Sequence, residues 1–494
     1  MFRVMRISRR ADVSVFQFNN VLRRFFSAEN FKSKKCLVPF SANKCYCLKC
    51  ASSLSSPGHL SFKIHKRSLF GSRSYHSLNK NLIPEHEFNK RANDTRFLCT
   101  CNGCILNKPF STRCEARKTC LYDLHIDHHG KLVDFAGWLL PLQYGEAIAT
   151  SHQHTRMAAS LFDVGHMLQT VVSGRHAGEF LESLTPSDLK NLPIGKAALT
   201  VFTNDQGGIL DDLIITKDGE DKFFVVSNAG RRDEDSELLL KQQKIFTSHD
   251  KKVSLEFLDP LEQGLVALQG PKASQALQSF TTINLNDLKF MHSLKTEFFG
   301  NQIRISRCGY TGEDGFEISL PRTIARQFVD LILSAEYVKL AGLGVRDSLR
   351  LEAGLCLYGI DINETTTPVE ADLTWLIAKR RRAEKNFPGA EKILFQILTK
   401  PLRKRVGLLL GQGPPARAGA VLLTPEGEAV GKVTSGGPSP TLGRHIAMGY
   451  LPLNLCHPGS GVLVEIRGKT YKATVSKMPF VKTNYYTGKE SAGI

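Results

Sequence analysis

The stretch Phe202–Thr216 constrains the fold of this 494-residue chain more than any other segment. Apolar and β-branched residues flank Asn204–Gly208, whose residue types tolerate positive φ, so the stretch predicts two antiparallel strands joined by a tight turn. The second strand has apolar residues on both faces, which is typical of a strand buried on both sides. Asp211 and Asp212 interrupt it, and their side chains are expected on opposite faces because side chains alternate along a strand.

A carboxylate among apolar neighbours is costly to ionise unless a partner compensates its charge. One interpretation is that these aspartates are structural and bind backbone N–H groups or a nearby arginine. The other is that one of them lines a dry pocket and faces a nitrogen-bearing ligand. The alternation along the strand does not distinguish Asp211 from Asp212, so both choices stay open at this point.

Positive charge is concentrated in the N-terminal part of the chain. Residues 1–118 hold 23 of the 65 Lys and Arg residues but only 6 of the 47 Asp and Glu residues, so the remainder is nearly neutral despite a net charge of +18. A nucleic-acid-binding surface across the main body is therefore not expected. Residues 1–28 are Arg-rich and acid-poor, which predicts a mitochondrial transit peptide and a location in the matrix.

Residues 29–118 are rich in Ser, Lys and Asn and predict a disordered basic leader extension. Within it Cys45–Cys50 and Cys99–Cys104 share the spacing C-x-C-x-x-C, which could hold zinc. A long processed leader accounts for the segment more simply. In the main body only Cys308, Cys356 and Cys456 follow residue 120, so neither a disulfide framework nor a metal site is expected there.

The body predicts an α+β protein. Short strands alternate with helices, including helices over 144–160, 323–334 and 341–355, and a linker is expected near 387–401. After that linker, six short strands separated by Gly and Pro turns predict a small antiparallel barrel. No run of eighteen apolar residues occurs, so no membrane span is expected. Five histidines between residues 125 and 154 lack acidic or Cys partners at ligand spacing and are expected at the surface or the core edge.

Three catalytic signatures do not occur in the body: a G-x-S-x-G elbow, a Walker loop and HExxH. What remains is a set of isolated carboxylates, Asn228 and scattered arginines, which could orient a polar heterocycle without a covalent enzyme intermediate. Arg346 and Arg350 share one helical face, which is typical of a solvated charge stripe. The basic run Lys379–Arg382 is typical of a solvated face or an interaction patch, and we consider that it docks an acidic carrier protein.

Several long, ordered motifs point to one family. They are Phe135–Trp138, Leu161–Met167, Gly207–Ile214, Cys308–Glu317, Arg346–Leu355, Thr434–Ser439 and Lys477–Val481. In these motifs the chain resembles the aminomethyltransferases, the T-proteins of the mitochondrial glycine cleavage system, from about Leu121 to Tyr486. The resemblance implies a three-domain cloverleaf of mixed and antiparallel sheets with helices around a central folate site, completed by a C-terminal antiparallel barrel. We expect the folate-binding region at 119–385 and the barrel domain at 398–486.

The resemblance also implies an activity. The methylene carbon of an aminomethyl-lipoyl group on H-protein would pass to tetrahydrofolate, with release of ammonia and formation of 5,10-methylene-tetrahydrofolate and dihydrolipoyl H-protein. Lipoylated H-protein and folate are thus the implied partners, with no nucleic acid. Asp212, rather than Asp211, matches the family's catalytic acid. The implied folate-binding residues are Glu317, Arg346, Tyr485, Asn228 and Met167.

Two other functions compete with this one. The folate-binding half of a dimethylglycine or sarcosine dehydrogenase would follow a flavin domain with a G-x-G-x-x-G segment, which the N-terminal 118 residues do not supply. A non-catalytic folate-binding scaffold is the alternative from another class, and the presence of Asp212 argues against it.

Overall fold

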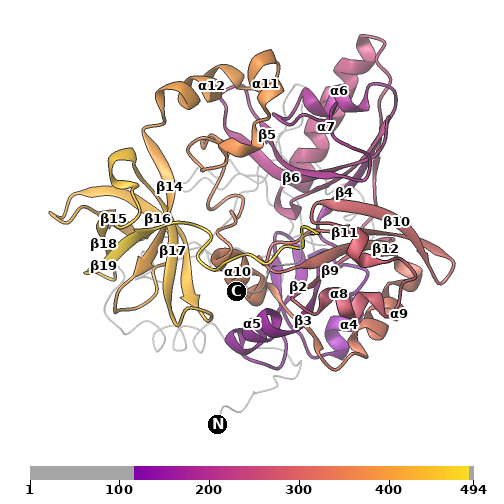
Figure 1. Ribbon diagram of the computed structural model, residues 1–494, viewed down its shortest axis with the longest axis horizontal. Helices are drawn as coiled ribbons and strands as arrows, with labels where there is room; N and C mark the ends of the chain where they lie inside the picture. Colours follow the sequence, from indigo (N-terminus) through magenta and orange to yellow (C-terminus); the bar gives the residue numbers. More distant parts are fainter. Residues whose placement is uncertain (1–115, 489–494) are drawn as a thin grey trace, which may run out of the picture. The chain divides into compact units, whose positions relative to one another are not determined.

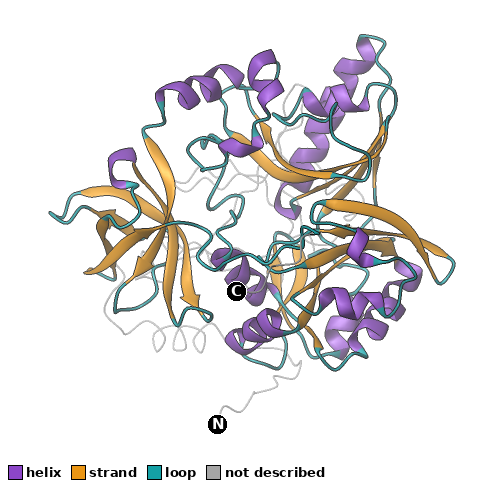
Figure 2. Ribbon diagram, viewed as in Figure 1, coloured by secondary structure: helices purple, strands orange, loops and turns teal. Residues whose placement is uncertain are grey.

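The computed structural model describes residues 116–488, which contain three sheets and a barrel (Figures 1 and 2). The predicted transit peptide, both cysteine clusters and nearly all of the predicted leader extension lie outside the described residues. Within residues 116–488 no helix combines the length and the hydropathy that crossing a membrane requires. The α+β class and the closed C-terminal barrel expected from the sequence are both confirmed.

A five-stranded antiparallel sheet carries the hairpin of the central motif. Its strand order is β5 (Ala197–Thr203), β6 (Ile209–Gly219), β7 (Lys222–Ser227), β4 (Leu168–Ser173) and β8 (Ser254–Phe257). Helices α6 (Ala177–Glu182) and α7 (Arg232–Ser248) pack on this sheet. Phe202 and Phe223 on the strands and Phe180 and Phe246 on the helices fill the core between the sheet and the helices.

The second large sheet has six strands. Its order is β10 (His292–Phe298), β11 (Asn301–Arg307), β12 (Gly315–Pro321), β9 (Gln263–Gln269), β3 (Ala159–Asp163) and β13 (Val338–Leu340). Only the pairing of β13 with β3 is parallel among these strands. Helices α8 (Ala273–Gln278) and α9 (Arg322–Leu333) cover it, and α9 buries Ile324, Phe328 and Ile332 at helical spacing.

Helix α10 (Leu343–Glu352) connects several parts of the body. It contacts α5 (Ile148–Met157) and the strand β2 (Trp138–Gln143). Strand β2 forms a hairpin with β1 (Lys131–Phe135) and also contacts α4 (Tyr122–Asp127). It also contacts the barrel strands β16 (Ala429–Ser439) and β17 (Arg444–Pro452). Figure 1 shows α10 near the centre of the described residues.

The C-terminal barrel closes through six antiparallel strands. The remaining strands are β14 (Arg403–Leu410), β15 (Val421–Leu423), β18 (Gly461–Ile466) and β19 (Lys469–Ser476), and β14 pairs with both β17 and β19. All six strands predicted from the sequence are confirmed. Within the predicted linker, residues 390–399 form helix α12 (Ala390–Thr399), which follows α11 (Lys379–Glu384) and buries Ile393.

Two sets of polar contacts attach the barrel to α10. Arg350 donates to the buried carboxylate of Asp361 at 2.7 Å and to the Ser435 hydroxyl at 2.9 Å, which joins α10 to β16. The segment after β19 then returns along α10, where the Phe480 N–H donates to the Glu352 carbonyl at 2.9 Å. Figure 1 shows this segment in yellow, running from the barrel past α10 towards β11.

The predicted helix over 144–160 is partly wrong. Helix α5 covers only Ile148–Met157, and residues 159–163 instead form β3 in the interior of the six-stranded sheet. Ala159, Leu161 and Phe162 are fully buried there, so sheet pairing and burial override the helical spacing of the sequence.

Candidate functional site

The turn between β5 and β6 fixes the position of the two aspartates. The Asn204 Oδ1 atom accepts hydrogen bonds from the Gln206 and Gly208 N–H groups at 3.0 and 2.8 Å. Gly207 has φ of +73°, and a Cβ atom at Gly208 would lie 1.7 Å from the Glu364 carbonyl oxygen. The sequence around Asn204 therefore sets the start of β6 against the loop that contains Glu364.

Asp211 and Asp212 share one hydrogen-bonding partner, Asn228, which follows β7. The Asn228 backbone N–H donates to Asp211 Oδ2 at 2.8 Å. Its side-chain amide nitrogen lies 3.0 Å from Asp211 Oδ1 and 2.9 Å from Asp212 Oδ1. Asp211 is fully buried, whereas Asp212 is partly exposed, so only Asp212 can present its carboxylate to a ligand.

The surroundings of Asp212 bring the pKa of its carboxyl group close to neutral pH. Burial, and next the charge of Asp211, raise the pKa of Asp212 to about 7. The hydrogen bond from Asn228 and the positive charge of Arg346 oppose this rise. A carboxyl group with a pKa near the working pH can both stabilise a cation and exchange a proton.

Arg346 on α10 brings positive charge to the same region. Its guanidinium lies 4.1 Å from the centre of the Tyr310 ring, and its charge acts on both Asp212 and Glu317. Arg346 is therefore not part of a solvated charge stripe, and neither is Arg350, which is buried and paired with Asp361. The expectation of a solvated stripe is wrong.

Three buried polar atoms around Arg346 have no hydrogen-bond partner among the described residues. They are Nη1 of Arg346, the hydroxyl of Tyr310 and Nδ1 of His166. Burial and the charge of Arg346 lower the pKa of His166 to about 3, so its ring is neutral at physiological pH. Unsatisfied buried polar atoms are rare in folded proteins, and a cluster of them is a feature of binding sites.

Glu317 on β12 presents an acceptor to this region. As expected from the alternation along the strand, its neighbours Phe316 and Ile318 are fully buried in the core of the sheet on the opposite face. Its hydrogen-bonding neighbour is the Cys308 thiol. Burial raises the pKa of Glu317 above its ordinary value, while the Arg346 charge and the thiol hydrogen bond oppose the rise.

The last two predicted residues occupy different surroundings. Met167 packs against the buried cluster of Phe162 and Val345, which Tyr310 also contacts. Tyr485 lies on the C-terminal segment and stacks on Phe290, with ring centres 4.1 Å apart. Hydrogen bonds or electrostatic interactions thus connect four of the six predicted site residues: Asp212, Asn228, Arg346 and Glu317. Met167 packs beside this group. Tyr485 is related to it only by the C-terminal segment, which returns along α10.

The basic run is engaged within the protein. Arg380 forms ion pairs with Glu182, Asp188 and Glu384, and the buried Arg381 donates to backbone carbonyls of the neighbouring loop. Arg382 also donates to two backbone carbonyls. These three arginines are thus engaged within the protein, whereas Lys379 is exposed, and docking of an acidic carrier on this run stays a prediction.

For two of the five histidines the position predicted from the sequence is wrong. His125 and His152 are fully buried, not at the surface or the core edge. His125 lies 2.8 Å from an oxygen of Asp163, and His152 lies 3.1 Å from an oxygen of Glu352. Within the described part of the chain no group of three or more His, Cys, Asp or Glu side chains could hold a metal ion.

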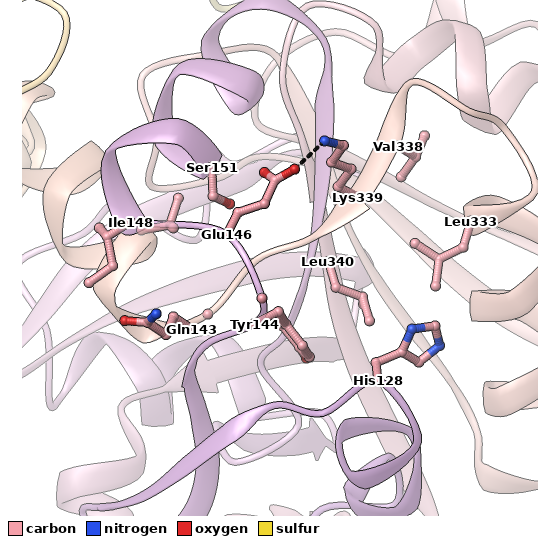
Figure 3. Close-up of a pocket in the computed structure, with 13 residues that line it drawn as sticks. His128, Gln143, Tyr144, Glu146, Ile148, Ser151, Leu333, Val338, Lys339 and Leu340 are labelled. Atoms are coloured by element: carbon pink, nitrogen blue, oxygen red, sulfur yellow. Dashed lines mark hydrogen bonds and ion pairs between the residues drawn. The ribbon is translucent and has the colours of Figure 1, made fainter. Parts of the chain in front are cut away.

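A cavity of about 320 Å³ opens elsewhere, beside β13 and α5 (Figure 3). Tyr144, His128 and Leu340 are among the residues that line it, as are Glu146 and Lys339, which form an ion pair at 2.5 Å. None of the six predicted site residues lines this cavity. It is therefore distinct from the site around Asp212.

The sequence missed three residues at the site: His166, Tyr310 and Asp235. His166 and Tyr310 belong to the motifs that carry the family resemblance, which was a usable signal. No sequence signal indicated Asp235, because it lies among charged residues at the start of α7. In the structure it is almost completely buried, and its Oδ2 atom has no hydrogen-bond partner among the described residues.

Two family models match the described region in order. The one described as the GCVT N-terminal domain matches residues 121–381, and the one described as the glycine cleavage T-protein C-terminal barrel domain matches residues 403–482. An α+β region with a buried carboxylate site, followed by a closed barrel, is thus the architecture of a glycine cleavage T-protein.

Relatives and a solved structure agree with these models. The mitochondrial aminomethyltransferases of Mus musculus and Homo sapiens are each 50% identical to the chain, over 78% and 77% of its length and 94% of theirs. The crystal structure of the glycine cleavage system aminomethyltransferase T from Bartonella henselae matches with a TM-score of 0.70 and 41% identity, covering 75% of this chain and 99% of that one.

The chain belongs to the aminomethyltransferase family, the T-proteins of the glycine cleavage system. It is accordingly an enzyme, a transferase, and the resemblance seen in the sequence motifs is confirmed. The names of the animal relatives and of the plant relative from Flaveria anomala support a mitochondrial location.

Proposed function

We propose that the site around Asp212 transfers the methylene carbon of an aminomethyl-lipoyl group on H-protein to tetrahydrofolate. Ammonia, 5,10-methylene-tetrahydrofolate and dihydrolipoyl H-protein are the products, and the matrix of the mitochondrion is the compartment. The observation that carries this proposal is the pairing of Asp212 with Asn228 beside the charge of Arg346, in a region with unsatisfied buried polar atoms.

The residues present fit a reduced pterin. Glu317 offers a carboxylate whose hydrogen-bonding neighbour is a weakly donating thiol, so it can accept from the N–H groups of a pterin edge. The unpartnered Tyr310 hydroxyl and Arg346 Nη1 add donors of the kind that a folate carbonyl or carboxylate would satisfy. Met167 would contribute apolar contact and Tyr485 an aromatic face.

Asp212 has the central role in the proposed mechanism. When bound, tetrahydrofolate supplies the amines that accept the one-carbon unit. The Asp212 carboxylate stabilises positive charge that develops on nitrogen near it and takes up or returns a proton. Asn228 holds one carboxylate oxygen by its amide N–H, which leaves the other oxygen for the ligand. Because the site is poorly solvated, this electrostatic stabilisation is stronger than in water.

The experiment that tests the proposal measures methylene-tetrahydrofolate formation from aminomethyl-loaded H-protein by the wild type and Asp212→Asn. The substitution keeps shape and removes the charge, so we expect kcat to fall by about 100-fold or more. Asp205→Asn is the matched control, because Asp205 is exposed in the turn that precedes β6. Normal turnover by Asp212→Asn would contradict the proposal.

The wild-type pH profile supplies a second readout of the same proposal. The active form carries the Asp212 carboxylate, and the pKa of Asp212 is raised to about 7. The rate is therefore expected to fall as pH drops through about 7, rather than near the ordinary aspartate pKa of about 4. A rate that stays constant down to pH 5 would contradict this assignment.

A further inference from the structure

A buried arginine on α5 is bonded to two other parts of the chain at once. The side chain of Arg156 is 7% exposed. Its Nη1 atom donates to the Thr311 carbonyl at 2.7 Å and to the Glu313 carboxylate at 2.9 Å, both in the loop between β11 and β12. Its Nε and Nη2 atoms donate to Glu352 Oε2, at the end of α10, at 3.2 and 2.8 Å. Because a guanidinium presents its N–H groups in a fixed plane, these bonds hold the loop and the helix end in one arrangement.

The two residues whose carboxylates bind this arginine also bind the C-terminal segment, defined here as residues 478–486. Glu313 Oε2 accepts a hydrogen bond from the side-chain amide of Asn484 at 2.9 Å. The backbone carbonyl of Glu352 accepts the N–H group of Phe480 at 2.9 Å. The C-terminal segment is therefore attached, at two points, to the residues that the arginine holds.

Close packing at Gly312 brings the same parts together. Gly312 has φ of +81°, and a Cβ atom there would lie 3.2 Å from the Cβ atom of Ala353, just after α10. The same Cβ atom would lie 3.6 Å from Arg156 Nη1 and 3.6 Å from Thr483 Cγ2 of the C-terminal segment. The backbone N–H group of Asn484 donates to the Gly312 carbonyl at 2.8 Å. A displacement of the loop would thus displace the C-terminal segment as well.

Two aromatic residues of the proposed folate site are the direct neighbours of residues in this network. Tyr310 precedes Thr311, and its buried hydroxyl has no hydrogen-bond partner among the described residues. Tyr485 follows Asn484, and its ring stacks on Phe290 with ring centres 4.1 Å apart. The hydrogen bonds of the network therefore fix the backbone on which both aromatic side chains are carried.

We propose that Arg156 is a positioning residue that holds Tyr310 and Tyr485 in place for tetrahydrofolate. It acts through its hydrogen bonds to the loop before β12, where Glu313 in turn holds the C-terminal segment. This inference deepens the proposed function and rests on it for the identity of the ligand. The attachment of the C-terminal segment by Arg156 does not depend on which ligand is bound.

Arg156→Lys tests the proposal while the positive charge is kept. A lysine ammonium is a compact point charge, so it cannot bond the Thr311 carbonyl and both carboxylates as the planar guanidinium does. We expect the backbone N–H groups of the C-terminal segment to exchange with deuterium about 10-fold faster than in the wild type. The KM for tetrahydrofolate is expected to rise about 5- to 10-fold, and kcat to stay within about twofold, because Asp212 and Asn228 keep their contacts.

The experiment measures hydrogen–deuterium exchange of the full chain by mass spectrometry, together with the kinetics of methylene-tetrahydrofolate formation. Lys482→Ala is the matched control, because Lys482 is an exposed residue of the same segment, and it should change neither quantity. Asn484→Ala removes the side-chain bond to Glu313 alone, so it should give a smaller rise in KM. Combined with Arg156→Lys it should add little, because both substitutions break the same connection.

Faster exchange of the C-terminal segment with a higher KM and a retained kcat, and little further change in the double variant, supports the inference. An unchanged KM in Arg156→Lys, even with faster exchange or lower stability, would overturn it and leave Arg156 a structural contact. Fully additive effects of the two substitutions would also overturn it. If Arg156→Lys does not fold, Arg156→Gln, which keeps an amide donor, is judged by the same criteria.

Failure of this inference can be distinguished from failure of the proposed function. If the proposed function is wrong, the wild type itself forms no methylene-tetrahydrofolate from aminomethyl-loaded H-protein. If only the role of Arg156 is wrong, the wild type is active and Arg156→Lys has the KM of the wild type.

Discussion

Two adjacent aspartates have different surroundings because they lie on opposite faces of β6. Asp211 faces the core and accepts the backbone N–H of Asn228, so the structural interpretation of a carboxylate on this strand applies to Asp211. Asp212 faces the region of Arg346 and keeps some exposure. Alternation along a strand predicts the opposite faces, but it does not say which face is lined by a second element such as α10.

Glu317→Gln tests folate recognition at the residue scale. The amide keeps the shape of the side chain but loses the charge and places an N–H donor where an acceptor is required. We expect the dissociation constant for tetrahydrofolate, measured by calorimetry, to rise about 10- to 100-fold. Glu297→Gln, on the exposed surface of β10, is the control and should bind normally. Equal affinities for wild type and Glu317→Gln would remove Glu317 from the site.

The buried position of Asp235 could not be predicted from the sequence. Its neighbours Asp233 and Glu234 have side chains that are 73% and 53% exposed, so the acidic first turn of α7 reads as a solvated helix start. Only the packing of α7 on the five-stranded sheet turns one of the three acids inward, against β6. No local pattern in the sequence contains that contact.

At the scale of elements, the hairpin of β5 and β6 was fully predictable because its turn chemistry is local. Asn204 and Gly207 specify the turn through hydrogen bonds and positive φ, all within residues 204–208. The barrel strands were predictable for a similar reason, since Gly and Pro turns delimit short alternating runs. Helix α12 was missed because it lies between Pro388 and Pro401 and resembles a short loop in length.

Gly208→Ala tests how strongly this turn positions the site. A Cβ atom there would lie 1.7 Å from the Glu364 carbonyl oxygen, so the hairpin or the loop must shift. We expect the free energy of unfolding, measured by denaturant titration, to fall by about 1–3 kcal/mol. Gly461→Ala is the control, because a Cβ atom at Gly461 meets no other atom within 4 Å. Equal stability of the two variants would mean that the turn does not constrain β6.

At the scale of the whole described region, α10 joins the site to the barrel. Arg346 faces the site from this helix, while Arg350, one turn later, binds Asp361 and the barrel strand β16. The spacing of the two arginines predicted a shared face, but their different surroundings depend on other elements, with Tyr310 beside Arg346 and Asp361 and Ser435 beside Arg350. The motifs identified the family, and hence the fold, whereas contacts of this kind between distant elements required the structure.

The most direct test of the central claim is the crystal structure of the full chain with tetrahydrofolate bound. We expect the Asp212 carboxylate within hydrogen-bonding distance of a folate amine, with Glu317 against the pterin edge. A pteridine bound elsewhere, for example in the cavity lined by Tyr144 and Lys339, with Asp212 turned to solvent, would contradict the account.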